Sequence, residues 1–208
     1  MGDKRQMMCV IFGGADIEDY SNVHIPEGAV VIAADGGYRH CVRLGIKPDC
    51  IIGDLDSNEE ELPEDCEIIT APREKDDTDL MMAVKTAFDE HISVFHIYGA
   101  DGGRMGHTFA SVQTLAYIDS HGREGILHGN GFVMRVCGVG KVSLNNDGYK
   151  YVSLFSLAQR SEISAKGLKY GGDIVLTSDF PLGVSNEFTG SSAEIEVKSG
   201  QILVILEK

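Results

Sequence analysis

The sequence has 208 residues, of which 43% are hydrophobic and 24% charged, proportions that are typical of a globular protein rather than a disordered chain. Its 32 acidic and 18 basic residues give a formal net charge of −14, which disfavours a nucleic-acid partner because so negative a surface repels phosphate backbones. No apolar run approaches the roughly 18 residues of a membrane span, and the five scattered cysteines suggest neither a zinc site nor a disulfide framework. We therefore expect a cytoplasmic protein with reduced thiols and no membrane partner.

The pattern of the first 130 residues predicts an α/β domain. Short apolar runs followed by Gly or Asp indicate buried strands, and segments with apolar residues at helical spacing indicate helices between them. The predicted strands are residues 8–12, 30–34, 50–52, 67–70 and 93–98. The predicted helices are residues 38–44, closed by Gly45, a segment that starts from an N-cap at Asp77 or Thr78, and residues 107–121. Because strands alternate with helices, the sheet should be mostly parallel.

After residue 131 the pattern changes to short runs rich in Val, Ile and Leu, which alternate with polar residues and are separated by turns. No helix of useful length fits this part. The predicted strands are residues 133–136, 142–144, 151–155, 174–176, 194–197 and 202–207. We therefore expect an all-β domain, a sandwich or small barrel, over residues 131–208, joined to the α/β domain of residues 1–130 at the glycine-flanked Asn130.

Four polar segments follow predicted strands of the α/β domain, at the positions where open α/β sheets bind their ligands. The first reads Ala-Asp-Gly-Gly and contains Asp35, Gly36 and Gly37. Its glycines would let the backbone approach a ligand closely, and the helix that follows would offer N–H groups to an anion. A tight strand-to-helix turn explains the same residues equally well, so this segment alone does not decide between the two.

Two acidic segments indicate a magnesium site. Asp54 and Asp56 are separated by one residue, so that in an extended loop both carboxylates can converge on one hard cation. A second segment adds Lys75, Asp76 and Asp79 at the start of a predicted helix. Helix capping explains one of these carboxylates, and an acidic turn in an acidic protein is the alternative for either segment alone. A metal held between the two loops would account for both, with the lysine offsetting the charge of a triphosphate.

The fourth segment, residues 99–107, is rich in glycine and leads from a predicted strand into a helix. Together with Arg104, the helix N-terminus would form a phosphate cradle, and His107 could bond a phosphate or cap the helix. The sequence contains no Walker-type G-x-x-x-x-G-K-[ST] loop, no G-x-S-x-G nucleophile elbow and no H-E-x-x-H zinc motif. What remains is metal-assisted phosphoryl transfer without a covalent intermediate.

In their order and spacing, these segments resemble the thiamine pyrophosphokinase family. The family pattern runs A-D-G-G, G-D-x-D-S, K-D-x-T-D and G-G-R-x-D-H-T in an α/β domain, followed by K-G-L-K-Y and S-N-E segments in a β-rich thiamine-binding domain. The matching residues of this chain are 34–37, 53–57, 75–79, 102–108, 166–170 and 185–187. The resemblance therefore covers nearly the whole chain.

The resemblance implies transfer of diphosphate from ATP to the hydroxyl of thiamine, with Mg²⁺ as cofactor and AMP as the second product. It also implies a homodimer that binds thiamine in a cleft between its subunits. The implied catalytic residues are Asp54, Asp56, Asp76, Asp79, Lys75 and Arg104, of which Asp54, Asp56 and Asp79 would hold the metal. The implied ATP-binding residues are Asp35, Gly36, Gly37, Lys75, Arg104 and His107. Ser185 and Asn186 would face thiamine, although a polar turn between strands is the alternative for that segment.

One position departs from the family pattern. Gly106 stands where the family usually has Asp before the histidine, so any role of that carboxylate is lost here or passes to a neighbour such as Asp101. Two other functions stay open: a related magnesium-dependent diphosphotransferase or phosphohydrolase with another acceptor, and a non-catalytic sensor of thiamine or nucleotide. Magnesium-dependent release of AMP would separate the enzymes from the sensor, and the identity of the acceptor would separate the enzymes from each other.

Overall fold

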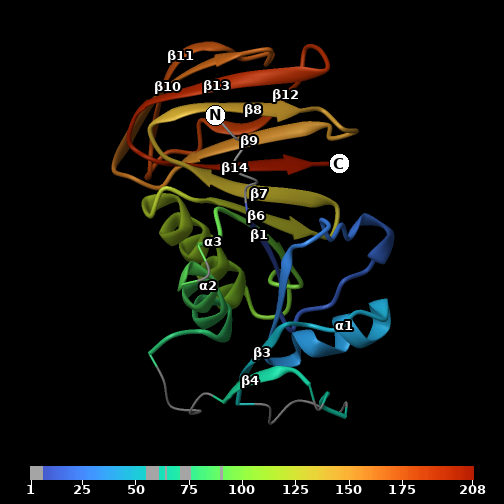
Figure 1. The fold of residues 1–208 in the computed structure, drawn as a ribbon. Helices are drawn as coiled ribbons and strands as arrows, with labels where there is room; N and C mark the ends of the chain where they lie inside the picture. The colour runs from blue at the N-terminus through green and yellow to red at the C-terminus, as the bar shows by residue number, and fades with distance from the viewer. Residues whose placement is uncertain (1–6, 55–60, 64, 71–75, 90) are drawn as a thin grey trace, which may run out of the picture. The chain divides into compact units, whose positions relative to one another are not determined.

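The computed structural model describes residues 7–54, 61–63, 65–70, 76–89 and 91–208 of the chain (Figure 1). The chain divides into two compact units, an N-terminal unit, Met1–Asn130, and a C-terminal unit, Gly131–Lys208. Each unit has a hydrophobic core of its own. Within the described residues, no helix combines the length and the apolar character that crossing a membrane requires.

A parallel sheet with helices on both faces forms the described part of the N-terminal unit. The strands lie in the order β6-β5-β1-β2-β3-β4, and each pairs in parallel with its neighbours. Their bounds are Met8–Phe12 for β1, Val30–Ala34 for β2, Cys50–Gly53 for β3, Glu67–Thr70 for β4, Val94–Tyr98 for β5 and Glu124–Gly129 for β6. From β1 the chain runs outward to β4 and then returns to place β5 on the other side of β1. The strand order therefore reverses between β1 and β5, which makes that position the topological switch point.

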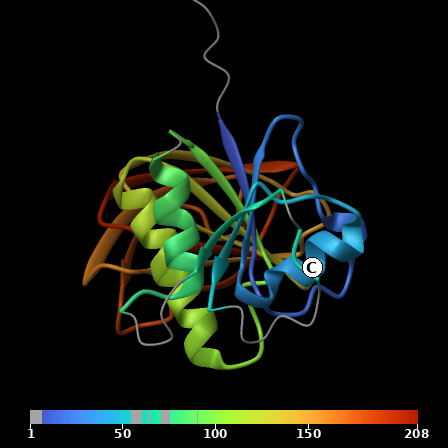
Figure 2. The ribbon, with the colours of Figure 1, turned by 60° about the horizontal axis from the view of Figure 1, so that its bottom comes forward.

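Helices α2 and α3 cover one face of this sheet and α1 covers the other, as the views in Figures 1 and 2 both show. The helices span Tyr38–Leu44 for α1, Asp79–Asp89 for α2 and Met105–Ser120 for α3, with short 3₁₀ turns η1 at Tyr20–Asn22 and η2 at Asp35–Gly37. Both faces of the sheet are thus buried, which explains why β1, β2 and β3 read as continuous apolar runs rather than as alternating ones.

The helix ends follow the signals in the sequence. Gly45 closes α1 in the left-handed conformation, at a φ of 66°, and its N–H donates to the carbonyl oxygens of Cys41 and Val42. At the start of α2, the Met81 N–H donates to Thr78 Oγ1 at 3.1 Å, so Thr78 is the predicted N-cap. The third helix begins at Met105, two residues before its predicted start.

Two four-stranded antiparallel sheets form the C-terminal unit, which is described throughout. Their strand orders are β12-β9-β14-β7 and β11-β10-β13-β8. The bounds are Phe132–Cys137 for β7, Gly140–Asn145 for β8, Tyr151–Ser156 for β9, Arg160–Lys166 for β10, Gly172–Thr177 for β11, Gly183–Glu187 for β12, Ser192–Ser199 for β13 and Ile202–Glu207 for β14. Inward-facing residues of both sheets, such as Ile195, Ile163, Leu154 and Val204, share one core. The unit is therefore a β-sandwich.

The predicted fold class is confirmed: a mostly parallel α/β part is followed by an antiparallel β part. Three strands, β6, β10 and β12, were not predicted. In β10 the only large apolar residue is Ile163, and β12 is short and polar. All five cysteines are free and four are buried, as expected for packed thiols, and burial raises the pKa of the Cys41 thiol to about 12.

Candidate functional site

The switch point brings the ends of β1 and β5 into close backbone contact. The Gly13 N–H donates to the Tyr98 carbonyl oxygen at 2.8 Å, and the Ala15 N–H donates to the Gly99 carbonyl oxygen at 2.8 Å. A Cβ added to Gly13 would lie 2.5 Å from the Gly99 oxygen, so no side chain fits there. Gly13 and Gly14, which the sequence suggested only as a short glycine turn, thus lie where open α/β sheets bind ligands.

The end of β2 packs onto the same place. A Cβ on Gly37 would lie 1.9 Å from the Phe12 carbonyl oxygen, so tight packing against β1 explains this glycine. Gly36 is different, because the nearest atom to an added Cβ is the Gly14 Cα at 3.7 Å, which is ordinary van der Waals contact. The turn explanation of the Ala-Asp-Gly-Gly segment therefore applies to Gly37, which packing requires. Packing does not require glycine at 36, where the approach of a ligand stays a prediction.

Backbone strain is found at two of the predicted site residues. Among the described residues other than glycine, φ is positive at Asp35 (50°), His91 (59°), Asp147 (40°) and Ser185 (56°). His91 and Asp147 lie in turns, whereas Asp35 follows β2 and Ser185 lies within β12. Strained non-glycine residues persist where the surrounding structure holds them, and they concentrate at functional sites. The sequence gives no sign of these two conformations.

The predicted magnesium ligands are partly described. Asp54 directly follows β3 and is half-buried, and Asp79 is the first residue of α2. Asp76 is exposed. Asp56 and Lys75 lie outside the described residues. Within the described ranges, no group of three or more His, Cys, Asp or Glu side chains could hold a metal ion, but carboxylates such as these are the hard oxygen donors that Mg²⁺ prefers.

The helix itself accounts for two other polar residues of the second acidic segment. Thr78 caps α2, and Asp77 forms an ion pair with Lys85 on the next turns of the helix, at 2.6 Å. Capping and charge pairing therefore explain these two side chains without a ligand.

The glycine-rich loop after β5 is held by the helix that follows it. The Gly102 N–H donates to Thr108 Oγ1 at 3.2 Å, and Ser111 Oγ donates to the Ala100 carbonyl oxygen at 2.7 Å. Arg104 occupies the N-cap position of α3, but its side chain makes no capping hydrogen bond, and both it and His107 are exposed. A fixed loop, an exposed guanidinium and the N-terminus of a 16-residue helix together suit an anion.

The carboxyl group of Asp101, in the same loop, is buried and accepts a hydrogen bond. The residue is only 6% exposed, and its Oδ2 accepts from the Asn130 N–H at 3.4 Å. Burial raises the pKa of the carboxyl, while the backbone hydrogen bond lowers it. A Cβ at Gly106, in contrast, would meet no atom of the described residues within 4 Å. The buried position of Asp101 gives no support to the idea that it replaces the missing carboxylate, and no contact with the described residues requires glycine at 106.

In the C-terminal unit, the K-G-L-K-Y segment and the S-N-E segment, which was predicted to face thiamine, lie side by side. Asn186 is 5% exposed, and its amide accepts from the Tyr170 and Glu187 N–H groups and donates to the Tyr170 carbonyl oxygen, at 2.8–3.0 Å. Lys169 Nζ also pairs with Glu187 Oε1 at 2.9 Å. Two of these hydrogen bonds hold the backbone of Tyr170, the last residue of the K-G-L-K-Y segment, and the third holds the N–H of the next residue, Glu187.

Ser185 lies at an irregularity of the edge strand. The register between β12 and β9 shifts between Gly183 and Asn186, and the Ser185 N–H donates to the buried Ser153 Oγ at 3.1 Å. Bulges of this kind turn a side chain away from the regular pleat. The Ser185 side chain is exposed, which leaves its hydroxyl accessible to a ligand.

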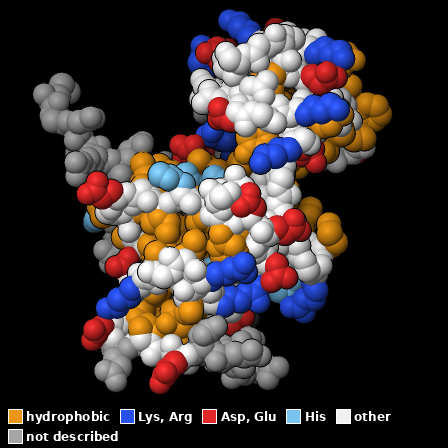
Figure 3. Space-filling view, turned by 90° about the vertical axis from the view of Figure 1, so that its right-hand side faces the viewer, with side chains coloured by type: hydrophobic (Ala, Val, Ile, Leu, Met, Phe, Trp, Pro, Cys, Tyr) orange, Lys and Arg blue, Asp and Glu red, His pale blue; other side chains and the backbone are white. Residues whose placement is uncertain are grey.

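The surface charge shows no broad basic field on the face drawn in Figure 3. Lys and Arg side chains lie there singly or in small groups among acidic and apolar ones. This distribution agrees with the formal net charge of −14.

Two family models match the sequence in succession. The catalytic domain of thiamin pyrophosphokinase matches residues 24–126, and the vitamin B1 binding domain of thiamin pyrophosphokinase matches residues 141–202. The chain belongs to the thiamin pyrophosphokinase family. The first match contains the ends of β2, β3 and β5, and the second contains the paired segments at Tyr170 and Asn186. No curated protein matches the sequence significantly.

Solved structures of thiamin pyrophosphokinases share the fold over nearly the full chain. The protein from Bacillus subtilis has a TM-score of 0.88 at 23% identity, covering 98% of this chain and 99% of its own. The protein from Geobacillus thermodenitrificans has a TM-score of 0.85 at 24% identity, with coverages of 97% and 98%. Yeast thiamin pyrophosphokinase has a TM-score of 0.73 at 15% identity, with coverages of 99% and 88%. At these identities the similarity establishes the fold, and the activity has to be argued from the site.

Proposed function

We propose that this protein transfers diphosphate from magnesium-bound ATP to the hydroxyl group of thiamine, releasing AMP. The observation that carries the proposal is the meeting of backbone from β1, β2, β3 and β5 at one edge of the sheet, in a chain with both domains of the family. There a Cβ on Gly53 would lie 3.0 Å from the Asp35 Cα, and Gly13 touches Gly99. Strand ends packed this closely leave room for a ligand beyond them rather than between them.

The residues of this edge divide the work of phosphoryl transfer. Asp54 and Asp79, with Asp56, would hold Mg²⁺, which when bound offsets the charge of the phosphate oxygens. Arg104 and the N-terminus of α3 would bind the phosphates, together with Lys75 and with the backbone at Asp35–Gly37. His107, exposed on the first turn of α3, would add a hydrogen bond to the same phosphates.

Bond making and breaking in this proposal need no covalent intermediate on the protein. The hydroxyl oxygen of thiamine attacks the β-phosphorus, the bond between that phosphorus and the oxygen that bridges it to the α-phosphorus breaks, and AMP leaves with that oxygen. The hydroxyl proton is released. The contribution of the chain is positioning and charge stabilisation, which is how phosphoryl-transfer enzymes generally act. Ser185 would contact thiamine through its exposed hydroxyl, and Asn186 would act by holding Tyr170 in place.

The decisive experiment is the reaction itself with a matched pair of variants. Wild-type protein with ATP, Mg²⁺ and thiamine should give AMP and thiamine diphosphate in equal amounts. Chromatography measures both products over time. Asp54→Asn should lower this rate by about a hundredfold or more, because it removes a charged metal ligand. Asp77→Asn removes the same charge nearby but breaks only an exposed ion pair, so its rate should stay within about twofold of wild type.

Each alternative function has its own outcome in this assay. Release of AMP that requires Mg²⁺ but not thiamine would indicate another acceptor or water. If folded protein releases no AMP with Mg²⁺ or Mn²⁺, the transferase proposal fails and the sensor hypothesis gains support. Equal loss of rate in both aspartate variants would contradict the assignment of Asp54 as a metal ligand.

We also propose that the protein forms a homodimer through the edge of the C-terminal unit at β12. Four large apolar side chains, here called the apolar edge, are strongly exposed along β12 and the segments beside it. They are Tyr170 at 66%, Phe180 at 65%, Leu182 at 56% and Val184 at 47% exposure. An open strand edge with apolar side chains is a surface that proteins normally cover. A second copy would cover it at the place where Ser185 is accessible.

The mass of the protein in solution tests the dimer. Light scattering should give twice the chain mass of 22.5 kDa for the wild type. Leu182→Asp places a charge in the apolar edge and should shift the protein to monomer, at a cost to dimer affinity of about a hundredfold. Val139→Asp provides the control, because Val139 is 72% exposed but lies outside the apolar edge, so this variant should remain dimeric. A monomeric wild type would refute the proposal, as would a Leu182→Asp dimer of unchanged affinity.

A further inference from the structure

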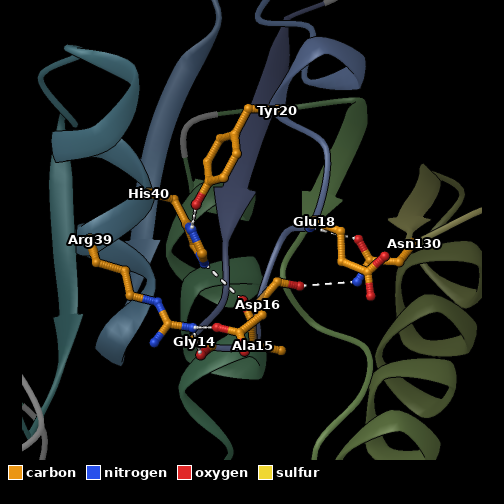
Figure 4. Close-up of polar contacts among 8 residues, drawn as sticks. All are labelled: Gly14, Ala15, Asp16, Glu18, Tyr20, Arg39, His40 and Asn130. Atoms are coloured by element: carbon orange, nitrogen blue, oxygen red, sulfur yellow. Dashed lines mark hydrogen bonds and ion pairs between the residues drawn. The ribbon is translucent and has the colours of Figure 1, made fainter.

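Hydrogen bonds to three elements hold the segment that leaves β1, residues 13–18, at the switch point. Figure 4 shows the bonds to α1 and to Asn130. None of the four sequence motifs of the α/β domain includes this segment. It contacts the end of β5 through the Gly13 and Ala15 N–H groups. It is also bonded by side chains from α1 and from the end of β6, and these bonds define where it lies beside the proposed nucleotide site.

From α1, His40 holds the segment by a hydrogen bond whose direction can be deduced. The His40 Nε2 lies 2.8 Å from the Ala15 carbonyl oxygen and its Nδ1 lies 2.6 Å from the Tyr20 hydroxyl. A carbonyl can only accept, so Nε2 carries the proton, Nδ1 accepts, and the tyrosine donates. The ring is 1% exposed, and burial lowers its pKa, which keeps this neutral form in place.

The neighbouring residue of α1 makes the next contact. The Arg39 guanidinium donates to the Gly14 carbonyl oxygen at 2.8 Å and to Asp16 Oδ1 at 2.7 Å. Successive carbonyl oxygens of the segment are therefore both bonded to α1. Because these oxygens already accept hydrogen bonds, they repel a nearby phosphate less than free carbonyls would.

Asn130, directly after β6, forms hydrogen bonds to the segment on the side away from α1. Its Oδ1 accepts from the Glu18 N–H at 2.9 Å, and its Nδ2 donates to the Asp16 carbonyl oxygen at 3.2 Å. Its own N–H donates to the buried Asp101 carboxyl in the glycine-rich loop. Asn130 thus links the segment, through its side-chain amide, to the loop that carries Arg104, through its backbone N–H.

Packing fixes this segment only in part. Ile17 packs against the core of the N-terminal unit. A cavity of about 480 Å³ is lined both by the segment and by α1, through Asp16, Ile17, Tyr20, Arg39, His40, Val42 and Arg43. Beside a cavity the packing contacts are incomplete, so the position of the segment also depends on its hydrogen bonds to α1. Of the two α1 side chains that bond the segment, Arg39 is partly exposed and its pair with Asp16 is screened by water, whereas the neutral His40 is buried.

We propose that residues 13–18 form a wall of the nucleotide site and that His40 is the positioning residue that holds this wall. The inference rests on the proposed function, because it takes the switch point to be the place where ATP binds. It extends that function by assigning ATP affinity to a buried histidine that would not touch ATP. Tyr20 has a smaller part, since it holds the histidine in the required tautomer.

Three variants and a control test the proposal. His40→Leu fills the site without hydrogen bonds, His40→Gln keeps a donor and an acceptor, and Tyr20→Phe removes only the hydroxyl that donates to Nδ1. The control is His121→Gln, an exposed histidine at the end of α3. For each protein we would measure KM for ATP, KM for thiamine, the calorimetric affinity for ATP without thiamine, and the midpoint of thermal unfolding.

His40→Leu should raise KM for ATP, and weaken the calorimetric affinity, by about tenfold, with KM for thiamine within about twofold of wild type. His40→Gln should recover most of that loss, and Tyr20→Phe should weaken ATP binding by about threefold. If His40 is merely structural, His40→Leu should lower the midpoint of thermal unfolding and leave both KM values of the folded fraction unchanged. That outcome overturns the proposal. So does an equal rise of both KM values.

The same measurements separate this inference from the proposed function. If the wild type binds ATP but transfers nothing to thiamine, the function fails, and the calorimetric affinities still decide the role of His40. If the wild type is active and the ATP affinity of His40→Leu is unchanged, only this inference fails. Should His40→Leu not fold, Tyr20→Phe decides, because unchanged ATP affinity in that variant contradicts the proposal. A wild-type protein that binds no ATP overturns both.

Discussion

Gly37→Ala should destabilise the N-terminal unit by about 3 kcal/mol or more, one of the largest effects expected from adding a single methyl group to this protein. The added Cβ would lie 1.9 Å from the carbonyl oxygen of Phe12 and 2.6 Å from its carbonyl carbon. Both are backbone atoms of a central strand, so neither can move aside without disturbing β1. The φ of Gly37 is −64°, which alanine adopts readily, so the effect is steric and not conformational.

Gly36→Ala is the matched control, because it adds the same methyl group one residue earlier. There the nearest atom would be the Gly14 Cα at 3.7 Å, and the expected cost is below about 1 kcal/mol. Urea unfolding followed by circular dichroism measures both variants against wild type. Equal stability of the two variants would show that the backbones of β1 and β2 do not approach as closely as described.

Acidification should remove roughly 3 kcal/mol of stability from the N-terminal unit as the pH falls from about 6.5 to about 4. The cause is a pair of histidines on adjacent strands, His96 on β5 and His128 on β6, whose Nδ1 and Nε2 atoms lie 2.9 Å apart. Their rings stack on each other, and His128 also stacks on Tyr98 at 4.5 Å between centroids. Burial, together with the neighbouring His96, lowers the pKa of His128 to about 4.

The sign of the effect follows from proton uptake. An unfolded histidine titrates near 6.5, whereas His128 in the folded state stays neutral down to about pH 4. Between these values the unfolded chain binds a proton that the folded chain does not, so unfolding becomes more favourable as the pH falls. Burial lowers the pKa of His96 as well, opposed by Glu124 and reinforced by His24. This pair of histidines therefore causes no loss of stability above about pH 6.5.

Unfolding free energies of wild type and His128→Gln, measured between pH 7 and pH 4, test this prediction. Glutamine does not titrate, so the unfolding free energy of the His128→Gln variant should decrease on acidification by less than half as much as that of wild type. His121→Gln, which changes an exposed histidine, should follow the wild-type curve. A wild-type stability that is flat over this range would mean that the pair accepts protons in the folded state.

Local signals in the sequence were sufficient for most elements of the fold. Gly45 and Thr78 marked helix ends correctly because capping depends on a few adjacent residues. β12 could not be predicted, because a short polar strand is formed by its pairing with β9 and not by its own pattern. The division into α/β and all-β parts was evident because helices and strands bury their apolar residues at different periods.

For the candidate site, the sequence supplied a hypothesis about its chemistry but no information about its geometry. Carboxylates, arginine and glycines after strands indicated phosphate and magnesium, and this part stays a prediction. The strained conformations of Asp35 and Ser185 depend on contacts from distant parts of the chain, so no local pattern announces them. Asn186 shows a related limit, since an asparagine in a polar segment gives no sign that its amide will be buried against Tyr170. The place of Gly13 and Gly14 could not be predicted for the same reason, because only the return of β5 beside β1 puts that turn at the switch point of the sheet.

The central position of β1 in its sheet also determines when the N-terminal unit can complete itself. Met8 pairs with Val94 and Phe12 with Tyr98, so the strand that is made first during synthesis waits for a partner more than 80 residues later. Until β5 arrives, β1 has one neighbour and an open edge of unpaired N–H and carbonyl groups. Closing so long a loop is slow, because its entropy is lost before the contacts form. The unit should therefore fold late and cooperatively, with its apolar middle strand vulnerable to association until then.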